Sequence, residues 1–156
     1  MQIYVLAVGD KPPSWIEAGV NQYIERMPRE CNVQINTIAT AKRSKSQAIK
    51  QAQAQEQELL LKHTPNDSLR IALDEHGKSW TTIVLAEKLE NWLQNFPVVT
   101  LYIGGPDGFT QDFLDQADFV WSLSTLTMPH MLVRVLLVEQ LYRAWTIIQG
   151  HPYHRE

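Results

Sequence analysis

Hydrophobic and polar positions follow one another along the chain in blocks that predict five strands separated by helices. Short runs rich in β-branched and aromatic residues predict the strands. These runs are Gln2–Val8, residues 33–38, Leu69–Leu73, Val98–Ile103 and Phe119–Leu123. Because strands and helices alternate, the pattern predicts an α/β fold with a mainly parallel sheet and helices on both faces. The sequence has no linker, low-complexity tract or internal repeat, so we expect a single domain over residues 1–156.

Five segments between or after these runs have the composition and end signals of helices. The first follows Pro12 and Pro13, with Ser14 as its expected N-cap, and ends before Pro28. The others are expected at residues 46–62, from a threonine cap at 81 or 82 to about Asn95, at 111–117 with Thr110 as the cap, and from Pro129 to Gln149. Together they supply the cover that a parallel sheet requires on both faces.

The last predicted helix is unusually apolar. From Met131 to Ile148, 13 of the 18 residues are apolar or aromatic, and they occupy nearly every side of the helix. Such a helix is buried or spans a membrane, and its charged residues argue against a membrane. A chain of 156 residues can hardly bury it on all sides, so we expect part of it to face another subunit in a symmetric homodimer. The alternative is an ordinary core helix with a solvent edge at Glu139 and Arg143.

The cysteine content and the N-terminus bear on the compartment. Cys31 is the single cysteine, which excludes an internal disulfide and a cysteine-ligated zinc site. We expect it to be an ordinary small thiol in a reducing compartment, the cytoplasm. The N-terminal MQIYVLAVGDK lacks a basic region before its short apolar run, so it is typical of a first strand rather than a signal peptide.

Charge is distributed unevenly along the chain. The formal net charge is −3, yet residues 1–50 hold seven Lys or Arg against four Asp or Glu. Much of this positive excess lies at Lys42, Arg43, Lys45 and Lys50. Such a cluster is either a solvated face or a local contact to nucleic acid.

Three predicted strand ends carry the residues best suited to hold a ligand, because open parallel sheets bind ligands at the carboxyl ends of their strands. They are Leu73-Asp74, Gly104–Gly108 and Ser122–His130. The second reads GGPDG, which is neither a dinucleotide fingerprint nor a Walker phosphate loop. Its glycines allow a ligand to approach the backbone. The third alternates hydroxyl and apolar side chains, which suits a polar heterocycle. A plain turn at GGPDG and a helix cap at Thr127 are the alternatives; together the two loops favour a cofactor pocket.

The terminal sequence HPYHRE holds the remaining candidate chemistry. It places two histidines, a tyrosine and an arginine directly after the apolar helix, where such groups contact phosphate, stack on a base or move a proton. A frayed polar end is the alternative. His151 and His154 have no carboxylate partner in a metal-binding pattern, so we expect no metal site, and the chain has no nucleophile motif.

Three motifs, IGGPDG, WSLSTLTMPHMLVRVLLVEQLYRAW and HPYHRE, resemble the large-subunit ribosomal RNA methyltransferase H family of the SPOUT superfamily. The resemblance covers the whole chain; one departure is Asp107, where the family typically has glutamate. It implies S-adenosylmethionine as the cofactor and a C-terminal trefoil knot, an exception to the rule that chains do not thread loops. It also implies a homodimer with the active site near the interface. The implied reaction is methylation at N3 of a pseudouridine in a hairpin loop of 23S ribosomal RNA.

The same resemblance implies cofactor-binding positions at the strand ends chosen above. They are Leu73, Gly104, Leu123, Ser124, Thr125, Leu126, Thr127 and Met128. For catalysis we expect a base or orienting group at His154 or Tyr153, because the tail follows the helix beside the cofactor loop. Arg155 and Arg134 are expected to pair with phosphate or with a developing negative oxygen.

The acidic charge bears on the substrate. An enzyme that searches for naked RNA is usually basic, so we expect this one to act on the assembled ribosome, with Lys42, Arg43 and Lys45 facing RNA. The alternatives are a transfer RNA methyltransferase of the same fold, a ribosome-binding factor without catalysis and a small-molecule nucleotide-binding protein.

Overall fold

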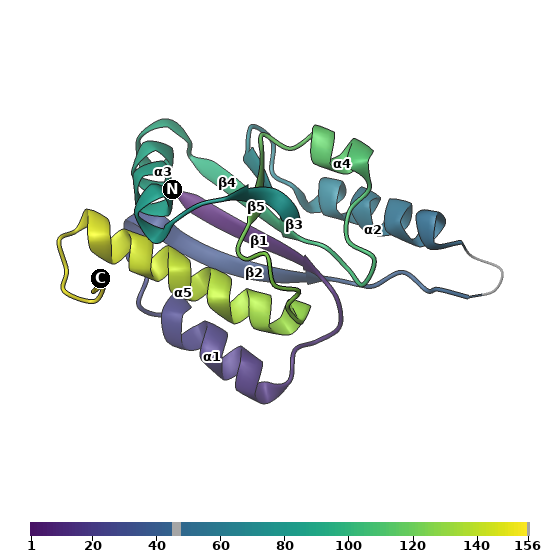
Figure 1. The fold of residues 1–156 in the computed structure, drawn as a ribbon, viewed down its shortest axis with the longest axis horizontal. Coiled ribbons are helices and arrows are strands. Elements are labelled where there is room, and N and C mark those ends of the chain that lie inside the picture. The colour runs from purple at the N-terminus through teal and green to yellow at the C-terminus, as the bar shows by residue number, and fades with distance from the viewer. Residues whose placement is uncertain (45–47, 156) are drawn as a thin grey trace.

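The computed structural model describes residues 1–44 and 48–155. Its centre is a five-stranded sheet with the strand order β2-β1-β4-β3-β5 (Figure 1). The strands are β1 (Gln2–Val8), β2 (Asn32–Ile38), β3 (Leu69–Ser79), β4 (Val98–Ile103) and β5 (Phe119–Ser122). Every neighbouring pair runs parallel. The predicted α/β class and parallel sheet are confirmed.

Helices cover both faces of the sheet (Figure 1). They are α1 (Ser14–Ile24), α2 (Ile49–His63), α3 (Thr82–Asn95), α4 (Gln111–Asp115) and α5 (His130–Ile148), with a short 3-10 turn at Arg29–Cys31. Because side chains alternate along a strand, β1 contributes Ile3 and Val5 to a core with α1, α3 and α5. It contributes Leu6 and Val8 to a second core with α2 and α4. The prediction of helices on both faces is therefore confirmed.

The helix caps are partly as predicted. Thr81 caps α3 and Thr110 caps α4, each accepting a hydrogen bond from the backbone N–H three residues later. The expectation for Ser14 is wrong: Ser14 is the first helical residue, and Pro13 occupies the N-cap in an extended conformation without a side-chain cap bond. The carbonyl of Pro13 instead accepts hydrogen bonds from the amides of Ile16 and Glu17. Two prolines fix the extended entry, so the helix begins without a polar cap.

Strand β3 is longer than predicted. It was expected to end at Leu73, but it continues to Ser79, with a register shift against β5 between Leu73 and Lys78. The polar stretch after Leu73 resembles a turn in sequence and is an irregularity within the strand. A Cβ at Gly77 would lie 2.6 Å from the carbonyl oxygen of Val120, so this position requires glycine.

Two helices are shorter than predicted. Helix α2 begins at Ile49, after an extended Ala48, whereas its start is predicted at residue 46; residues 45–47, including Lys45 and Ser46, lie outside the described residues. Helix α4 ends at Asp115 rather than Ala117, since the last amides bond to Phe113 and Leu114 in a tightened final turn.

Helix α5 has an apolar exposed edge. Leu132 and Leu136 are 38% and 41% exposed, whereas Glu139 and Arg143 are partly buried and form an ion pair. The exposed edge thus differs from the polar one that an ordinary core helix would have. Among the helices of the described ranges, none is both long and apolar enough to cross a membrane.

Candidate functional site

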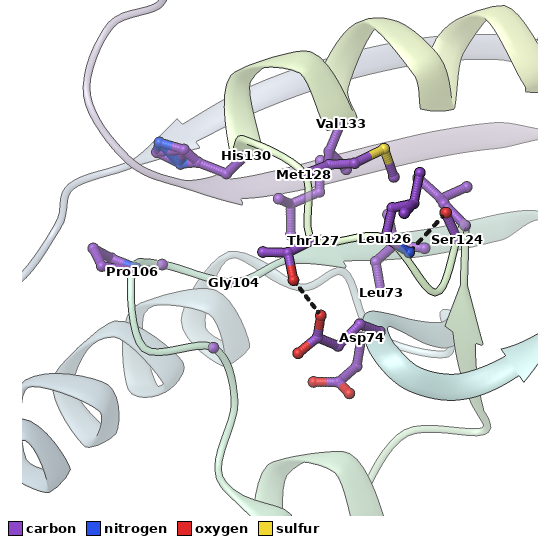
Figure 2. Close-up of a pocket in the computed structure, with 15 residues that line it drawn as sticks. Leu73, Asp74, Gly104, Pro106, Ser124, Leu126, Thr127, Met128, His130 and Val133 are labelled. Atoms are coloured by element: carbon purple, nitrogen blue, oxygen red, sulfur yellow. Dashed lines mark hydrogen bonds between the residues drawn. The ribbon is translucent and has the colours of Figure 1, made fainter.

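A pocket of about 240 Å³ lies at the carboxyl end of β4, beside the middle of β3 and before α5 (Figure 2). Seven of the eight expected cofactor positions line it: Leu73, Gly104, Leu123, Ser124, Leu126, Thr127 and Met128. Thr125 is the eighth; it is exposed and is not part of the lining. Asp74, Glu75, His130 and Val133 also border the pocket and were not singled out from the sequence as cofactor positions. The parallel register brings these residues together, because Leu73 in β3 pairs with Ile103 at the end of β4.

Hydroxyl groups fix the loop between β5 and α5. The amide of Leu126 donates to Oγ of Ser124 at 3.0 Å, and the Thr127 hydroxyl donates to Oε2 of Glu75 at 3.2 Å; both bonds are dashed in Figure 2. Thr127 therefore ties the loop to β3, and the N-cap of α5 is Pro129, not Thr127. Leu126 is 73% exposed at the mouth of the pocket. The loop offers backbone groups and an apolar rim to a ligand.

The GGPDG loop closes on itself and is held from outside. The amide of Gly108 donates to the carbonyl of Gly105 at 3.0 Å, which forms a turn around Pro106 and Asp107. Nε of Arg43 donates to Oδ2 of Asp107 at 2.6 Å. The loop is thus more than a plain turn: it forms one wall of the pocket, and α2 and its preceding segment support it.

His130 and Arg134 lie one turn apart on α5 but differ in access to the pocket. His130 borders the pocket, and burial lowers its pKa, with the Arg134 charge adding to the effect and Asp10 opposing it. Arg134 is only 1% exposed, and Nη1 donates to Oγ1 of Thr37 at 3.2 Å. Its Nε and Nη2 have no hydrogen-bond partner among the described residues, and burial lowers its pKa. The sequence analysis named Arg134 as a catalytic candidate and His130 only as the last residue of the Ser122–His130 segment, yet His130 is the one that borders the pocket.

The C-terminal tail packs back onto the second half of α5 (Figure 1). The Tyr153 hydroxyl donates to Oε1 of Glu139 at 3.2 Å, and its ring meets that of Tyr142 edge-on at 4.9 Å. Nδ1 of His154 lies 3.4 Å from Nη1 of Arg143. Burial first, and then hydrogen bonding to Tyr23, raise the pKa of Tyr153 to about 12, so its phenol stays protonated at neutral pH.

The tail does not line the pocket of its own chain. His154, Tyr153 and Arg155 are absent from the pocket lining within the described residues. Glu139 and Arg143, which hold the tail, lie nine and thirteen residues beyond His130 on α5, respectively. At 1.5 Å per residue they are roughly 13 to 20 Å from the pocket end of the helix. The structure therefore separates the three catalytic candidates of the tail from the expected cofactor residues within one chain.

The placement of the His, Cys, Asp and Glu side chains bears on metal and thiol chemistry. Across residues 1–44 and 48–155, no group of three or more His, Cys, Asp and Glu residues is placed to hold a metal ion. Cys31 is buried, and burial raises its pKa to about 11, so the thiol stays protonated and unreactive.

Comparison with known proteins identifies the class to which this fold and pocket belong. A family model described as a predicted SPOUT methyltransferase matches residues 1–154. The chain therefore belongs to the SPOUT methyltransferase family, as its motifs had indicated.

Individual relatives match along their full length. The ribosomal RNA large subunit methyltransferase H of Saccharophagus degradans is 48% identical over 155 residues, covering 99% of this chain and 100% of that protein. Proteins of the same name from Teredinibacter turnerae and Hahella chejuensis are 49% and 47% identical, covering 99% and 100% of this chain and all of theirs. A solved structure of a probable methylase family protein from Haemophilus influenzae shares the fold, with a TM-score of 0.53 and 13% identity, over 95% of this chain and 66% of that one.

Proposed function

We propose that this chain is an S-adenosylmethionine-dependent methyltransferase of large-subunit ribosomal RNA. Its proposed target is N3 of a pseudouridine in a hairpin loop of 23S ribosomal RNA. One observation carries the proposal: seven of the eight positions expected to bind the cofactor line a single pocket. The full-length similarity to proteins named ribosomal RNA large subunit methyltransferase H supports the substrate.

The residues around the pocket fit the cofactor chemically. Gly104 and the loop before α5 offer backbone amides and carbonyls to an adenine ring, and Leu73, Leu126 and Met128 offer apolar contact to its faces. The carboxylates of Asp74 and Glu75 border the same space, where they suit ribose hydroxyls and a cationic sulfonium. When bound, the cofactor supplies an electrophilic methyl group. The chain itself must orient the target base and deal with one proton.

The proton on N3 sets the task of the catalytic residues. N3 of a uracil ring has no free lone pair until its proton leaves, so a base near the pocket would contribute ~10²–10⁴-fold in rate. His154 remains our candidate for the base. The raised pKa of Tyr153 makes it a hydrogen-bond donor rather than a base, and Arg155 is a candidate partner for phosphate. Because Arg134 is buried against Thr37, we assign it the support of the β2 end in place of a direct phosphate contact.

A second subunit would bring these residues to the pocket. The tail lies away from the pocket of its own chain, and the pocket, at about 240 Å³, is smaller than the ~300 Å³ at which typical ligand sites begin. The exposed Leu132 and Leu136 on α5 offer an apolar surface beside it. We propose a homodimer in which the tail of one protomer completes the pocket of its partner. The knot that the family implies belongs to the same proposal, since it would hold the pocket loops together.

The proposed substrate form is the assembled ribosome in the cytoplasm. A dimer of this chain carries a formal charge near −6 by doubling the −3 of the chain, which disfavours a search along naked RNA. Lys42 and Lys50 are exposed and remain candidates to face RNA. Arg43 does not, because its guanidinium is bonded to Glu56 and Asp107.

Methyl transfer with labelled S-adenosylmethionine tests the proposal. We expect label to enter the large-subunit RNA of ribosomes from cells lacking this protein, faster than it enters naked ribosomal RNA. Calorimetry should show that the isolated protein binds the cofactor. Label in transfer RNA instead, or cofactor binding without transfer to any ribosomal particle, would show that the substrate is wrong while the pocket is right.

A further inference from the structure

Side chains on one face of α2 form hydrogen bonds with the GGPDG loop and with Thr110 after it. Gln53, Glu56 and Gln57 are spaced by three and four residues, so they lie on the same side of the helix. Nε2 of Gln53 donates to the carbonyl of Asp107 at 2.9 Å. Oε1 of Gln57 accepts hydrogen bonds from the amide and hydroxyl of Thr110, at 2.8 and 3.1 Å. The loop is therefore held at both its tip and its far end.

Arg43, from the segment before α2, connects Glu56 of α2 to Asp107 of the loop. Its Nη1 and Nη2 donate to the two carboxylate oxygens of Glu56 at 2.8 and 2.9 Å. Its Nε donates to Oδ2 of Asp107 at 2.6 Å, and Nη1 also donates to the carbonyl of Ala41 at 2.9 Å. All three nitrogens of the guanidinium are engaged, so Arg43 bridges two carboxylates on separate elements. A lysine has no planar fork and would reach only one of them well.

Glu56 is a buried anchor for this bridge. It is 2% exposed, and the amide of Ala41 donates to its Oε2 at 3.1 Å. A Cβ at Gly105 would lie 2.9 Å from Oε1 of Glu56, so the carboxylate packs directly against the backbone of the pocket loop. A buried carboxylate needs its cation, because removal of one partner leaves an uncompensated charge.

We propose that Arg43 is a positioning residue for the cofactor pocket: anchored on Glu56, it holds Asp107 and so fixes the shape of residues 104–108. The inference rests on the proposed function in that the pocket is taken to bind S-adenosylmethionine. An exposed ion pair is usually weak because two long side chains must be ordered to form it. Here Glu56 already orders Arg43, so the bond to Asp107 restrains the loop at less entropic cost. A restrained loop binds its ligand more tightly because less freedom is lost on binding.

Two replacements of Asp107 separate this role from that of a simple turn residue. Asp107→Asn keeps the size and the turn preference but removes the charge, whereas Asp107→Glu keeps the charge and changes the size. We call the arrangement in which Arg43, anchored on Glu56, holds Asp107 the clamp. It predicts that Asp107→Asn weakens cofactor affinity about two- to fivefold, measured by calorimetry, and that the affinity of Asp107→Glu stays close to that of the wild type. Asp107→Asn should raise KM for the cofactor and leave KM for ribosomes unchanged. A turn role predicts the reverse order of the two variants.

A second set of variants tests whether Asp107 acts through Arg43. Arg43→Ala alone would strand the Glu56 carboxylate, so Arg43→Ala is combined with Glu56→Gln. In that background Asp107→Asn should have no further effect on cofactor affinity, since its partner is gone. Lys62→Ala removes an exposed cation from the same helix α2 and serves as the charge control. Melting curves for every variant confirm that it is folded.

The outcomes distinguish the clamp from the proposed function. If wild type does not bind S-adenosylmethionine, the cofactor assignment fails and the clamp fails with it. If wild type binds it, and Asp107→Asn and the folded Arg43→Ala/Glu56→Gln variant bind equally well, the cofactor assignment stands and the clamp is overturned. If Asp107→Asn weakens binding equally in both backgrounds, Asp107 does not act through Arg43, which also overturns it.

Discussion

At the scale of single residues, the charge states near the pocket follow from burial. His130 borders the pocket, and burial with the neighbouring Arg134 charge lowers its pKa, so its ring is neutral at physiological pH. The sequence named seven positions that the structure brings to one pocket, because glycines and hydroxyl residues after a strand are recognisable; that these positions bind the cofactor stays a prediction. It could not distinguish His130 from Arg134, since only the packing of α5 decides which of the two is enclosed. Likewise it could not show that Arg43 bonds to the pocket loop, because the contact joins residues 64 positions apart.

The lowered pKa of His130 predicts a pH dependence of stability. In the unfolded chain the His130 ring binds a proton near pH 6.5, and in the folded chain it does so only at lower pH. The unfolded state therefore gains this proton first as the pH falls. The free energy of unfolding should therefore decrease below about pH 6.5. His130→Gln should make this decrease shallower, as measured by denaturant unfolding at several pH values. The exposed His63 is the control. An unchanged slope in His130→Gln, or the same change in His63→Gln, would contradict the account.

The raised pKa of Cys31 predicts an inert thiol. The side chain is fully buried and its pKa is about 11, so little thiolate exists below pH 9 and reagent access is blocked. We expect no reaction with a chromogenic disulfide reagent at neutral pH, and one thiol per chain after denaturation. Rapid labelling of the folded protein would show that the site opens.

At the scale of elements, helix α5 connects the pocket to the proposed dimer. Its composition predicted an apolar helix with one face that the core of the chain does not bury. In the structure the exposed apolar residues on α5 are Leu132 and Leu136. The sequence could not identify this face, because apolar residues occur on nearly every side of the helix. The exposed face depends on how α1 and α3 pack against α5.

Replacing an exposed leucine of α5 tests the interface. Leu132→Glu adds a charge to a surface that is 38% exposed in the single chain and buried in the proposed dimer. We expect this variant to be monomeric in light scattering with size-exclusion chromatography, and to lose methyl transfer. Ile83→Glu on α3 is the matched control, since Ile83 is also 38% exposed, and it should remain dimeric. A Leu132→Glu protein that remains dimeric would show that α5 does not form the interface.

At the scale of the whole molecule, the fold separates two halves of one proposed active site. The loops proposed to bind the cofactor lie at one end of α5 and the tail lies along the other. The sequence supplied both halves as motifs, but it could not show their separation, which depends on the length of α5 and the return of the tail. A dimer resolves the separation if each tail serves the pocket of its partner.

Mixed dimers test this arrangement directly. His154→Ala inactivates the tail, and Gly104→Val adds bulk at a position that lines the pocket. Each variant alone should be nearly inactive. If the tail acts on the partner's pocket, subunit exchange between the two variants should restore up to about a quarter of wild-type activity, because half the dimers then hold one complete site. No recovery, with exchange confirmed by mass, would place the tail and the pocket of one chain in the same site.

The most direct test of the central claim is the position of the methyl group. Ribosomes from cells lacking this protein would be treated with the protein and S-adenosylmethionine, and the nucleosides of their 23S RNA analysed by mass spectrometry. The account predicts one added methyl group per large subunit, at N3 of a pseudouridine. A methyl group on another nucleoside would contradict the assigned target, and the absence of any methyl group on ribosomal RNA would contradict the function itself.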